Sequence, residues 1–261
     1  MTRLSAGHAR VKRLRKLSRR RSVRRDEGLF VLHGPTLVAE ALSSQVVLDE
    51  VFVSEAPEFA LQSLLDTSAV EVFEVDPSVL QKAVDVVTPQ SVVATARLPE
   101  DSLDQVLAPA EGLVVGLMGV SDPGNVGTLI RTAEAAGVRG LLIGPETADP
   151  FGPKTVRASA GSVLRVPVAS VDTADVAELG ALGWSVVATA GDGGEPLEAH
   201  EWAPATIVLL GNEAAGLAAE TVDHADAAVT IDHEPSVESL NVAIAGALVM
   251  FDWRRRARPA I

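Results

Sequence analysis

The first hundred residues alternate between short apolar runs and segments whose apolar positions repeat with helical spacing. A spacing of three to four residues predicts a helix, and a short run rich in β-branched residues predicts a strand. The pattern predicts helices at 8–25, 36–42, 58–66 and 77–84, an apolar run at 29–32, and extended segments at 48–54, 70–75 and 91–96. Such alternation is typical of a small α/β domain, which we assign to residues 1–98.

A second alternating series follows a polar stretch at residues 99–111, which the pattern indicates to be a linker. Residues 112–261 form this second α/β domain, which begins with a buried strand at 113–118. Further strands are predicted at 141–143, 184–189, 206–210 and 227–231, and helices at 126–136, 173–182 and 218–225. A last helix ends in three arginines, and its apolar stripe consists of Leu240, Ile244, Ala247, Leu248 and Phe251.

Three polar segments follow predicted strands of the second series, at 122–137, 210–217 and 231–242. In an open α/β sheet, ligands bind in the crevice at the carboxyl ends of the strands. The first segment opens with an Asp-Pro-Gly-Asn turn, and we expect Asn125 to cap the helix that follows. Arg131 lies about one and a half turns into that helix, at the edge of its apolar stripe. These segments are the candidates for a binding or catalytic site.

Charge is distributed very unevenly along the chain. Residues 1–25 contain eleven lysines and arginines and no acidic residue. The rest holds the other 11 basic residues and all 35 acidic residues, a net charge of −24, against −13 for the whole chain. A basic arm of this kind indicates an anionic partner, for which the phosphates of nucleic acid are the usual source. A solvated tail and an organellar transit peptide are the alternatives.

Composition excludes several classes of protein. The chain has no cysteine, which excludes disulfides and thiolate metal sites and favours an intracellular, cytoplasmic location. No apolar stretch approaches the roughly 20 residues that span a membrane. The glycine fingerprint of dinucleotide folds and the P-loop are both absent, and no cluster has the spacing of metal ligands. His224 and His233 stand alone in the sequence, and we interpret them as surface histidines.

The three polar segments, in this order and spacing, resemble the motifs of the SpoU (TrmH-like) RNA ribose methyltransferases, which belong to the trefoil-knotted SPOUT class. The run from Asp149 to Phe151 and the pattern Lys154-x-x-Arg157-Ala158-Ser159-x-Gly161 resemble a further block of that family. The N-terminal half is similar to the substrate-binding domain, like ribosomal protein L30, that many members carry. The chain departs from the family pattern at Asp232, where proline is usual, and at His33, where glutamate is frequent.

The resemblance implies a fold, a cofactor and a set of site residues. The fold is a C-terminal trefoil-knotted methyltransferase domain with a smaller N-terminal α/β domain similar to ribosomal protein L30. The cofactor is S-adenosylmethionine, held near Thr189, Gly211, Asn212, Gly216, Ile231 and Leu240. The residues implied in catalysis are Asn125, Arg131, Glu213, Ser239 and Asn241. The residues expected to contact RNA are Arg13, Arg15, Arg20, Arg21, Arg131, Lys154 and Arg157.

The family assigns Arg131 a central role, sometimes as the general base. Neutralising an arginine at pH 7 costs about 7 kcal/mol, because its pKa lies above 12. Two roles therefore stay open for Arg131. It is either a base with a strongly depressed pKa or an anchor that grips an RNA phosphate and orients the hydroxyl.

The resemblance implies an enzyme that methylates a ribose 2′-hydroxyl of structured RNA, ribosomal or transfer, as a homodimer without a metal ion or a membrane. The sulfonium methyl is already activated, so the enzyme has to align the hydroxyl and handle its proton. Three alternatives stay open. They are a base methyltransferase of the same class, a non-catalytic RNA-binding relative, and a nicotinamide dehydrogenase, for which the glycine fingerprint is missing.

Overall fold

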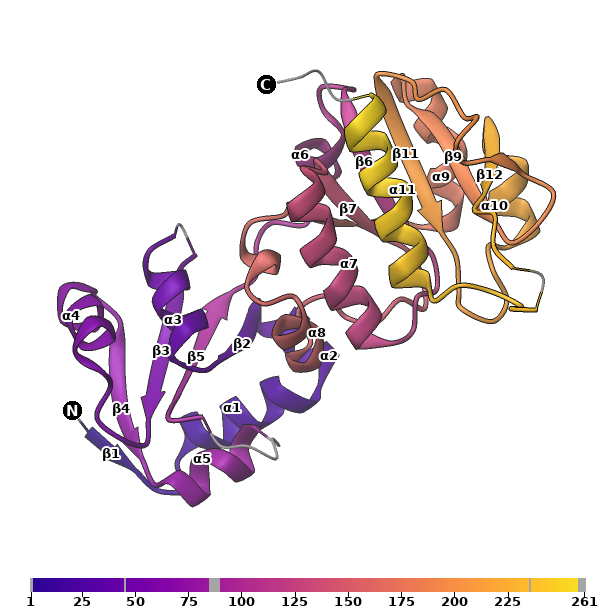
Figure 1. Ribbon diagram of the computed structural model, residues 1–261. Coiled ribbons are helices and arrows are strands. Elements are labelled where there is room, and N and C mark those ends of the chain that lie inside the picture. Colours follow the sequence, from indigo (N-terminus) through magenta and orange to yellow (C-terminus); the bar gives the residue numbers. More distant parts are fainter. Residues whose placement is uncertain (1, 45, 85–89, 235, 258–261) are drawn as a thin grey trace. The chain divides into compact units, whose positions relative to one another are not determined.

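The computed structural model describes residues 2–44, 46–84, 90–234 and 236–257. The chain forms two compact units, each with its own sheet (Figure 1). Unit 1 consists of Met1–Glu100 and Phe151–Leu164, and unit 2 of Asp101–Pro150 and Arg165–Ile261. The division of the sequence at residue 112 assigned residues 151–164 to the C-terminal domain, whereas they pack with unit 1.

Unit 1 is built on a five-stranded sheet in the order β1-β4-β3-β5-β2. Its strands are β1 (Thr2–Leu4), β2 (Leu29–His33), β3 (Leu48–Val53), β4 (Glu71–Val75) and β5 (Val92–Arg97). Strands β1, β4 and β3 run parallel, and β5 is antiparallel to both β3 and β2. The extended segments predicted at 48–54, 70–75 and 91–96 are confirmed as β3, β4 and β5. Strand β1 was not predicted, because three residues are too few to leave a pattern.

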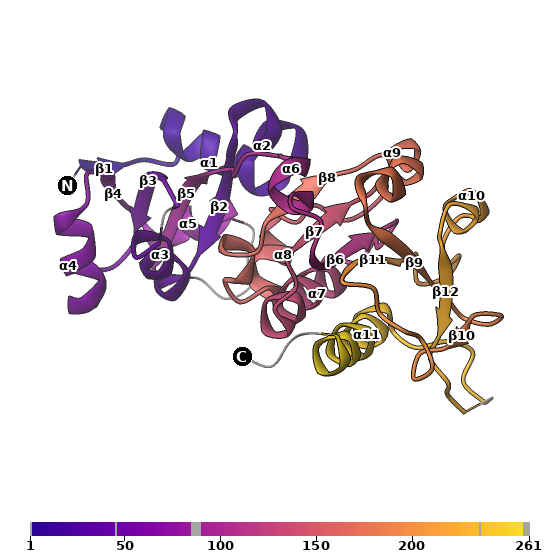
Figure 2. The same cartoon turned by 90° about the horizontal axis from the view of Figure 1, so that it is seen from above.

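Helices cover both faces of this sheet. They are α1 (Ala9–Arg19), α2 (Arg21–Glu27), α3 (Pro35–Leu42), α4 (Phe59–Thr67), α5 (Pro77–Val84), α8 (Pro153–Ala158) and the 3-10 helix η1 (Ser162–Leu164). Helices α1 and α5 bury Leu14, Leu17 and Leu80 against one face, together with Phe52 and Phe73 of the strands. Helices α3 and α4 lie on the other face (Figure 2).

The N-terminal arm contains two helices rather than the single helix predicted over 8–25. Arg20 has an extended backbone, with φ −124° and ψ 114°, and separates α1 from α2. The buried guanidinium of Arg24 donates a hydrogen bond of 2.6 Å to the carbonyl oxygen of Leu17, in the last turn of α1. The last four carbonyls of a helix have no partner within the helix. Arg24 therefore stabilises the end of α1 and the break that follows it.

Two arginines of α1 are bound by acidic residues of the same unit. Arg13 forms ion pairs with Glu27 and with Asp49, the latter at 2.9 Å. Arg10 pairs with Glu50, a carboxylate that is almost completely buried. These pairs hold α1 against the sheet, so part of the positive charge of the arm is neutralised within unit 1.

Residues 151–164 join unit 1 through α8, which packs beside β2. The ring of Phe151 meets the ring of Phe30 edge-on, with a centroid distance of 5.2 Å. Gly161, at φ +91°, lies against the carboxylate of Glu40, where a Cβ would come within 2.4 Å of an oxygen atom. The block between Lys154 and Gly161 that resembles a family motif is therefore part of unit 1.

His33 ends β2 and stands where the family pattern often has glutamate. Its side chain is 5% exposed, and neither ring nitrogen has a hydrogen-bond partner in the described part of the chain. Burial and the nearby Arg157 guanidinium lower the pKa of His33 to about 4. Partial burial also lowers the pKa of Arg157, whose side chain is still exposed to solvent. His33 is therefore neutral at pH 7 and brings no counter-charge to Arg157.

Unit 2 is built on a seven-stranded sheet in the order β10-β12-β9-β11-β6-β7-β8, in which all neighbouring strands are parallel. Its strands are β6 (Gly112–Leu117), β7 (Gly140–Ile143), β8 (Val168–Ser170), β9 (Ser185–Ala190), β10 (Glu195–Pro196), β11 (Ala205–Leu210) and β12 (Ala227–Thr230). The five strands predicted for the second series are confirmed as β6, β7, β9, β11 and β12. The short strands β8 and β10 were not predicted.

Helices also cover both faces of the parallel sheet. They are α6 (Leu103–Leu107), α7 (Pro123–Ala136), α9 (Thr173–Leu179), α10 (Ala219–Asp223), α11 (Val242–Arg256) and the 3-10 helix η2 (Gly180–Leu182). Helices α7 and α11 lie side by side on one face, and α6, α9 and α10 lie on the other (Figure 2). The helix predicted over 173–182 corresponds to α9, an α-helix of about two turns, followed directly by the 3-10 helix η2.

The stretch at 99–111, expected to be a linker, contains α6 and contributes to the core of unit 2. Val106 and Leu107 are buried together with Trp184 and with Val176 of α9. The indole nitrogen of Trp184 donates a hydrogen bond of 3.2 Å to the carbonyl oxygen of Leu107. The sequence did not predict α6 because its few apolar positions lie among polar residues. Five residues are too few to show a helical period.

Helices α7 and α11 approach closely at Gly246 of α11. A Cβ at Gly246 would lie 2.4 Å from Cδ2 of Leu129 and 2.8 Å from Cδ1 of Leu210. The missing side chain therefore allows α11 to pack against both α7 and β11. This contact holds the N-terminus of α11 near the carboxyl end of β11.

The low pKa of His33 predicts a loss of stability in acid. Its pKa is about 4 in the folded chain and near 6.5 in the unfolded chain. Between these values the unfolded state binds a proton and the folded state does not, so stability is complete above pH 6.5 and falls as the pH drops toward 4. The full shift corresponds to about 3 kcal/mol.

Urea unfolding at about pH 7 and about pH 4.5 measures this loss. His33→Gln should lose clearly less stability than the wild type on acidification, because it removes the buried titrating ring. His224→Gln, at an exposed histidine, should leave the loss unchanged. An identical loss for His33→Gln and the wild type would contradict the prediction.

Candidate cofactor and catalytic site

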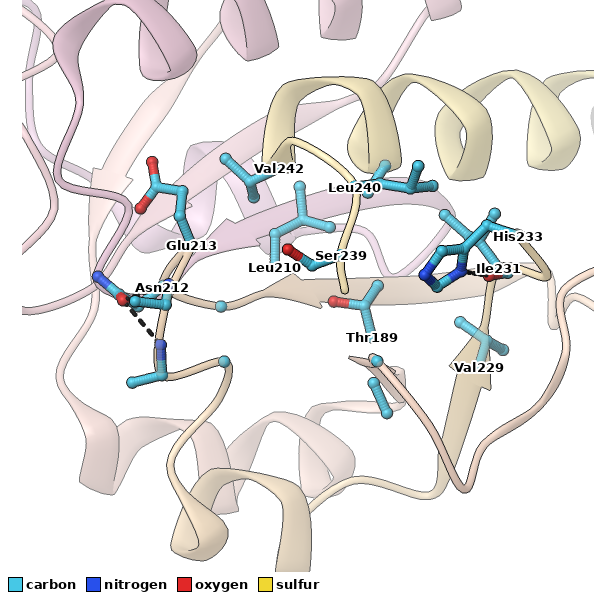
Figure 3. A pocket seen from close by; sticks show the side chains of 17 residues that line it. Thr189, Leu210, Asn212, Glu213, Val229, Ile231, His233, Ser239, Leu240 and Val242 are labelled. Atoms are coloured by element: carbon cyan, nitrogen blue, oxygen red, sulfur yellow. Dashed lines mark hydrogen bonds between the residues drawn. The ribbon is translucent and has the colours of Figure 1, made fainter. Parts of the chain in front are cut away.

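A pocket of about 290 Å³ opens at the carboxyl ends of β9, β11 and β12 (Figure 3). Three loops line it: the loop after β9, the loop after β11, and the loop that leads from β12 to α11. Apolar side chains form part of the wall, namely Leu210, Val229, Ile231, Leu240 and Val242. This is the edge at which parallel sheets bind their ligands.

The structure brings to this pocket all six residues expected to bind the cofactor. They are Thr189, Gly211, Asn212, Gly216, Ile231 and Leu240. Two of the residues expected in catalysis, Glu213 and Ser239, line it as well. In Figure 3, Asn212 and Glu213 lie at one end of the pocket, and Val229 and Ile231 lie at the other. The pocket therefore has a polar end and an apolar end.

The loop after β11 is held by hydrogen bonds of its own. The backbone N–H and C=O groups of Asn212 pair with those of Gly216, both at 2.9 Å. The side-chain oxygen of Asn212 accepts from the backbone N–H groups of Ala214 and Ala215, at 2.9 and 3.0 Å. Its amide nitrogen donates to the carbonyl oxygen of Gly119 at 2.8 Å. All these bonds lie within unit 2, so the loop holds its shape without a ligand.

Gly211 is required at the start of this loop because the backbone passes too close for a side chain. A Cβ at Gly211 would lie 2.3 Å from the carbonyl carbon of Gly216 and 2.4 Å from the nitrogen of Leu217. Gly216 has φ +68°, in the left-handed region that favours glycine. These glycines place bare backbone at the pocket wall. Such a wall fits S-adenosylmethionine, which the family resemblance expects to be held by backbone groups.

A chain of side-chain hydrogen bonds borders the polar end of the pocket. The amide nitrogen of Asn125 donates to Oε1 of Glu213 at 2.9 Å. The amide oxygen of Asn125 accepts from the amide nitrogen of Asn241 at 3.1 Å. The oxygen of Asn241 caps α11 by accepting from the N–H groups of Ala243 and Ile244, at 2.9 and 3.3 Å. Each amide is therefore fixed in one orientation by a donor on one side and an acceptor on the other.

Asn125 does not cap α7, contrary to the prediction from its turn sequence. The cap is Asp122, whose Oδ1 accepts from the backbone N–H of Asn125 at 2.9 Å. The helix begins at Pro123, so Asn125 lies in the first turn. Because Asp122 satisfies the helix end, the side chain of Asn125 is available to bridge Glu213 and Asn241.

Arg131 lies on α7, six residues after Asn125 and about 9 Å further along the helix axis. Its side chain is exposed, and it forms no hydrogen bond or ion pair with the part of the chain that the structure describes. It does not line the pocket. Its position leaves the guanidinium open to a large ligand that covers α7.

His233 lines the pocket, whereas the sequence analysis interpreted it as a surface histidine. Its Nδ1 lies 3.0 Å from the carbonyl oxygen of Ile231. The signal for this residue was its place in the third polar segment, where it follows Asp232 between two pocket residues, Ile231 and Leu240. Asp232, the departure from the family's proline, is exposed and does not line the pocket.

The cations expected to contact RNA differ in exposure. On unit 1, Arg20, Lys154 and Arg157 are exposed, whereas Arg15 and Arg21 are half-buried. Exposed cations are the ones that a phosphate backbone can reach.

In residues 2–44, 46–84, 90–234 and 236–257, no group of three or more His, Cys, Asp or Glu side chains is arranged to hold a metal ion. Over the same ranges, no helix combines the length and the apolar character needed to cross a membrane.

Two family models match the chain. Residues 112–251 match the SpoU rRNA Methylase family, and residues 8–94 match the MRM3-like substrate binding domain. The second match lies within unit 1, and the first contains every strand of the parallel sheet of unit 2.

A curated relative matches over almost the full length. The 23S rRNA (guanosine(2553)-2′-O)-methyltransferase RlmP of Bacillus subtilis (strain 168) is 33% identical over 251 residues. The alignment covers 96% of this chain and 98% of that protein.

Solved structures with bound AdoMet (S-adenosylmethionine) share the fold. The AdoMet-bound rRNA methyltransferase from Sinorhizobium meliloti has a TM-score of 0.87 at 32% identity, covering 99% of this chain and 98% of that chain. The SpoU methyltransferase AviRb from Streptomyces viridochromogenes, in complex with AdoMet, has a TM-score of 0.88 at 27% identity, covering 95% and 97%. The motifs, the parallel sheet and the pocket at its carboxyl edge all agree with these matches, and the chain belongs to the SpoU rRNA methylase family.

Proposed function

We propose that the chain transfers the methyl group of S-adenosylmethionine to a ribose 2′-hydroxyl of ribosomal RNA. One observation carries the proposal: the pocket that suits the cofactor ends at the hydrogen-bonded chain of Asn241, Asn125 and Glu213. The relative from Bacillus subtilis is named a 23S rRNA 2′-O-methyltransferase, which supports the ribose hydroxyl as the acceptor.

The walls of the pocket would hold the cofactor through backbone groups of the loops around Gly211, Ile231 and Leu240. The bound sulfonium supplies an activated methyl group. The task of the chain is to place the hydroxyl in line with that methyl group and to accept or relay the hydroxyl proton. The polar end of the pocket, at Asn212 and Glu213, is the place where protein side chains can meet the substrate, and Ser239 lies between this end and Ile231 (Figure 3).

Arg131 anchors the RNA outside the pocket, on α7. A guanidinium presents donors in a planar fork that matches phosphate oxygens, and Arg131 is exposed on α7 with its donors unused in the described part of the chain. Glu213 and Asn241 orient Asn125, and Asn125 fixes the position of the Glu213 carboxylate. Ser239 faces the pocket and positions the hydroxyl group (Figure 3).

Unit 1 binds the RNA and has a fold similar to ribosomal protein L30. The match to an MRM3-like substrate binding domain supports this assignment. Arg20, Lys154 and Arg157 supply exposed positive charge, and the half-buried Arg15 and Arg21 of the arm add to it. Arg13 contributes less to RNA binding than the sequence analysis expected, because its guanidinium already pairs with carboxylates of unit 1.

Unit 2 contains a trefoil knot. After β12 the chain has to pass β9 and β11 in the sheet order before α11 begins beside α7. The match of residues 112–251 to the SpoU rRNA Methylase family supports the knot, because the resemblance implies the trefoil-knotted class.

The chain acts as a homodimer in the cytoplasm, with the two copies in contact through α11. Ile244, Leu248 and Phe251 are 55%, 45% and 41% exposed. Their spacing of four and three residues places them on one face of the helix. A contiguous apolar face of this kind is typical of a surface that another protein covers.

Leu248→Glu should convert the dimer to a monomer, because it places a charge in the centre of the α11 face. Leu182→Glu is the matched control, since Leu182 is 58% exposed on η2, away from α11. Light scattering at micromolar concentration measures the mass of each variant. A monomeric wild type would contradict the proposal, as would a Leu248→Glu variant that stays dimeric.

Arg131→Ala should lower methyl transfer to ribosomal RNA by about 100-fold or more, because the RNA loses its anchor. Arg131→Lys should also be slow, since it retains the charge without the planar fork. The affinity for S-adenosylhomocysteine, measured by calorimetry, should stay near the wild-type value, because Arg131 does not line the pocket.

Digestion of the product RNA to nucleosides identifies the methylated atom. The proposal expects 2′-O-methyl nucleosides after incubation with the wild type and none above background with Arg131→Ala. Methyl groups on a base would overturn the ribose assignment, and near wild-type transfer by Arg131→Ala would overturn the role of Arg131.

A further inference from the structure

His233 presents a hydrogen-bond acceptor to the cofactor pocket. Its Nδ1 lies 3.0 Å from the carbonyl oxygen of Ile231. A carbonyl oxygen only accepts, so Nδ1 carries the hydrogen of this bond. The neutral imidazole has one ring hydrogen, which leaves Nε2 with a free lone pair. In Figure 3 the imidazole extends from the loop after β12 toward the middle of the pocket.

The surroundings of His233 indicate which part of a ligand lies there. The neighbouring side chains of the wall, Val229, Ile231 and Leu240, are apolar. At the opposite end of the pocket lies Glu213, which is hydrogen-bonded to Asn125. The proposed function requires the reacting methyl group near that polar end. The end at His233 is then left for a flat, mainly apolar group, which in S-adenosylmethionine is the adenine ring.

We propose that His233 recognises the adenine of the cofactor by accepting a hydrogen bond from its exocyclic 6-amino group at Nε2. The ring nitrogens of adenine that are not bound to ribose are acceptors and cannot pair with an imidazole acceptor. The 6-amino group is the donor that remains. A purine with a 6-oxo group instead presents an acceptor to Nε2, which leaves two lone pairs facing each other. His233 is therefore a specificity-determining residue for the cofactor.

Calorimetry with two ligands tests this assignment, which rests on the proposed function. The ligands are S-adenosylhomocysteine and its 6-oxo analogue, S-inosylhomocysteine. The wild type should prefer the 6-amino compound by about tenfold or more. His233→Met, which removes the acceptor and keeps an apolar side chain, should weaken S-adenosylhomocysteine about 3- to 10-fold. It should also bring the two affinities close to each other.

Two further variants make the result specific. His233→Gln keeps an acceptor oxygen and should retain part of the preference for the 6-amino compound. This variant also tests the proposal if His233→Met does not fold. His224→Met carries the same substitution at an exposed histidine outside the pocket and should match the wild type. If folded His233→Met kept the wild-type ratio of the two affinities, the role of His233 would be overturned, but the cofactor assignment would stand. Failure of the wild type to bind S-adenosylhomocysteine would overturn the cofactor assignment as well.

Discussion

The site depends on one chain of hydrogen bonds, from Asn241 through Asn125 to Glu213. It joins the start of α11, the first turn of α7 and the loop after β11, three segments that lie far apart in the sequence. Asn241 also caps α11, so the same side chain fixes a helix end and orients its neighbour. Because every amide group has a donor and an acceptor in place, the carboxylate of Glu213 is held at the pocket before any ligand arrives.

This chain is possible because glycines allow backbone and helices to approach one another. Gly246 brings α11 against Leu129 of α7 and Leu210 of β11, which places Asn241 within reach of Asn125. Gly211 allows the loop after β11 to fold back on Gly216 and to present its backbone to the pocket. Packing on one face of the sheet and the shape of the cofactor loop are therefore linked at the carboxyl end of β11.

The sequence predicted most of the fold and the location of the site, because both leave local patterns. The strands of the parallel sheet that carry the site are apolar runs, and the residues expected at the cofactor cluster around one pocket. Other features depend on partners that no local pattern reveals. Arg13 was expected to contact RNA, but its guanidinium pairs with Glu27 and Asp49. Arg24 stabilises the break between α1 and α2 through the Leu17 carbonyl. Residues 151–164 come after the first strands of the second domain in the sequence. They nevertheless pack in unit 1, because α8 covers β2.

The substitution Asn125→Asp tests the central claim most directly. It preserves the size of the side chain and the acceptor for Asn241, but it replaces the donor to Glu213 with a second carboxylate. Loss of a hydrogen bond to a charged group corresponds to about a 10- to 100-fold change in rate. The account predicts that methyl transfer to ribosomal RNA falls by at least that amount, while the affinity for S-adenosylhomocysteine stays within about threefold of the wild type. Wild-type methyl transfer by Asn125→Asp would contradict the claim that this hydrogen-bonded chain organises the site.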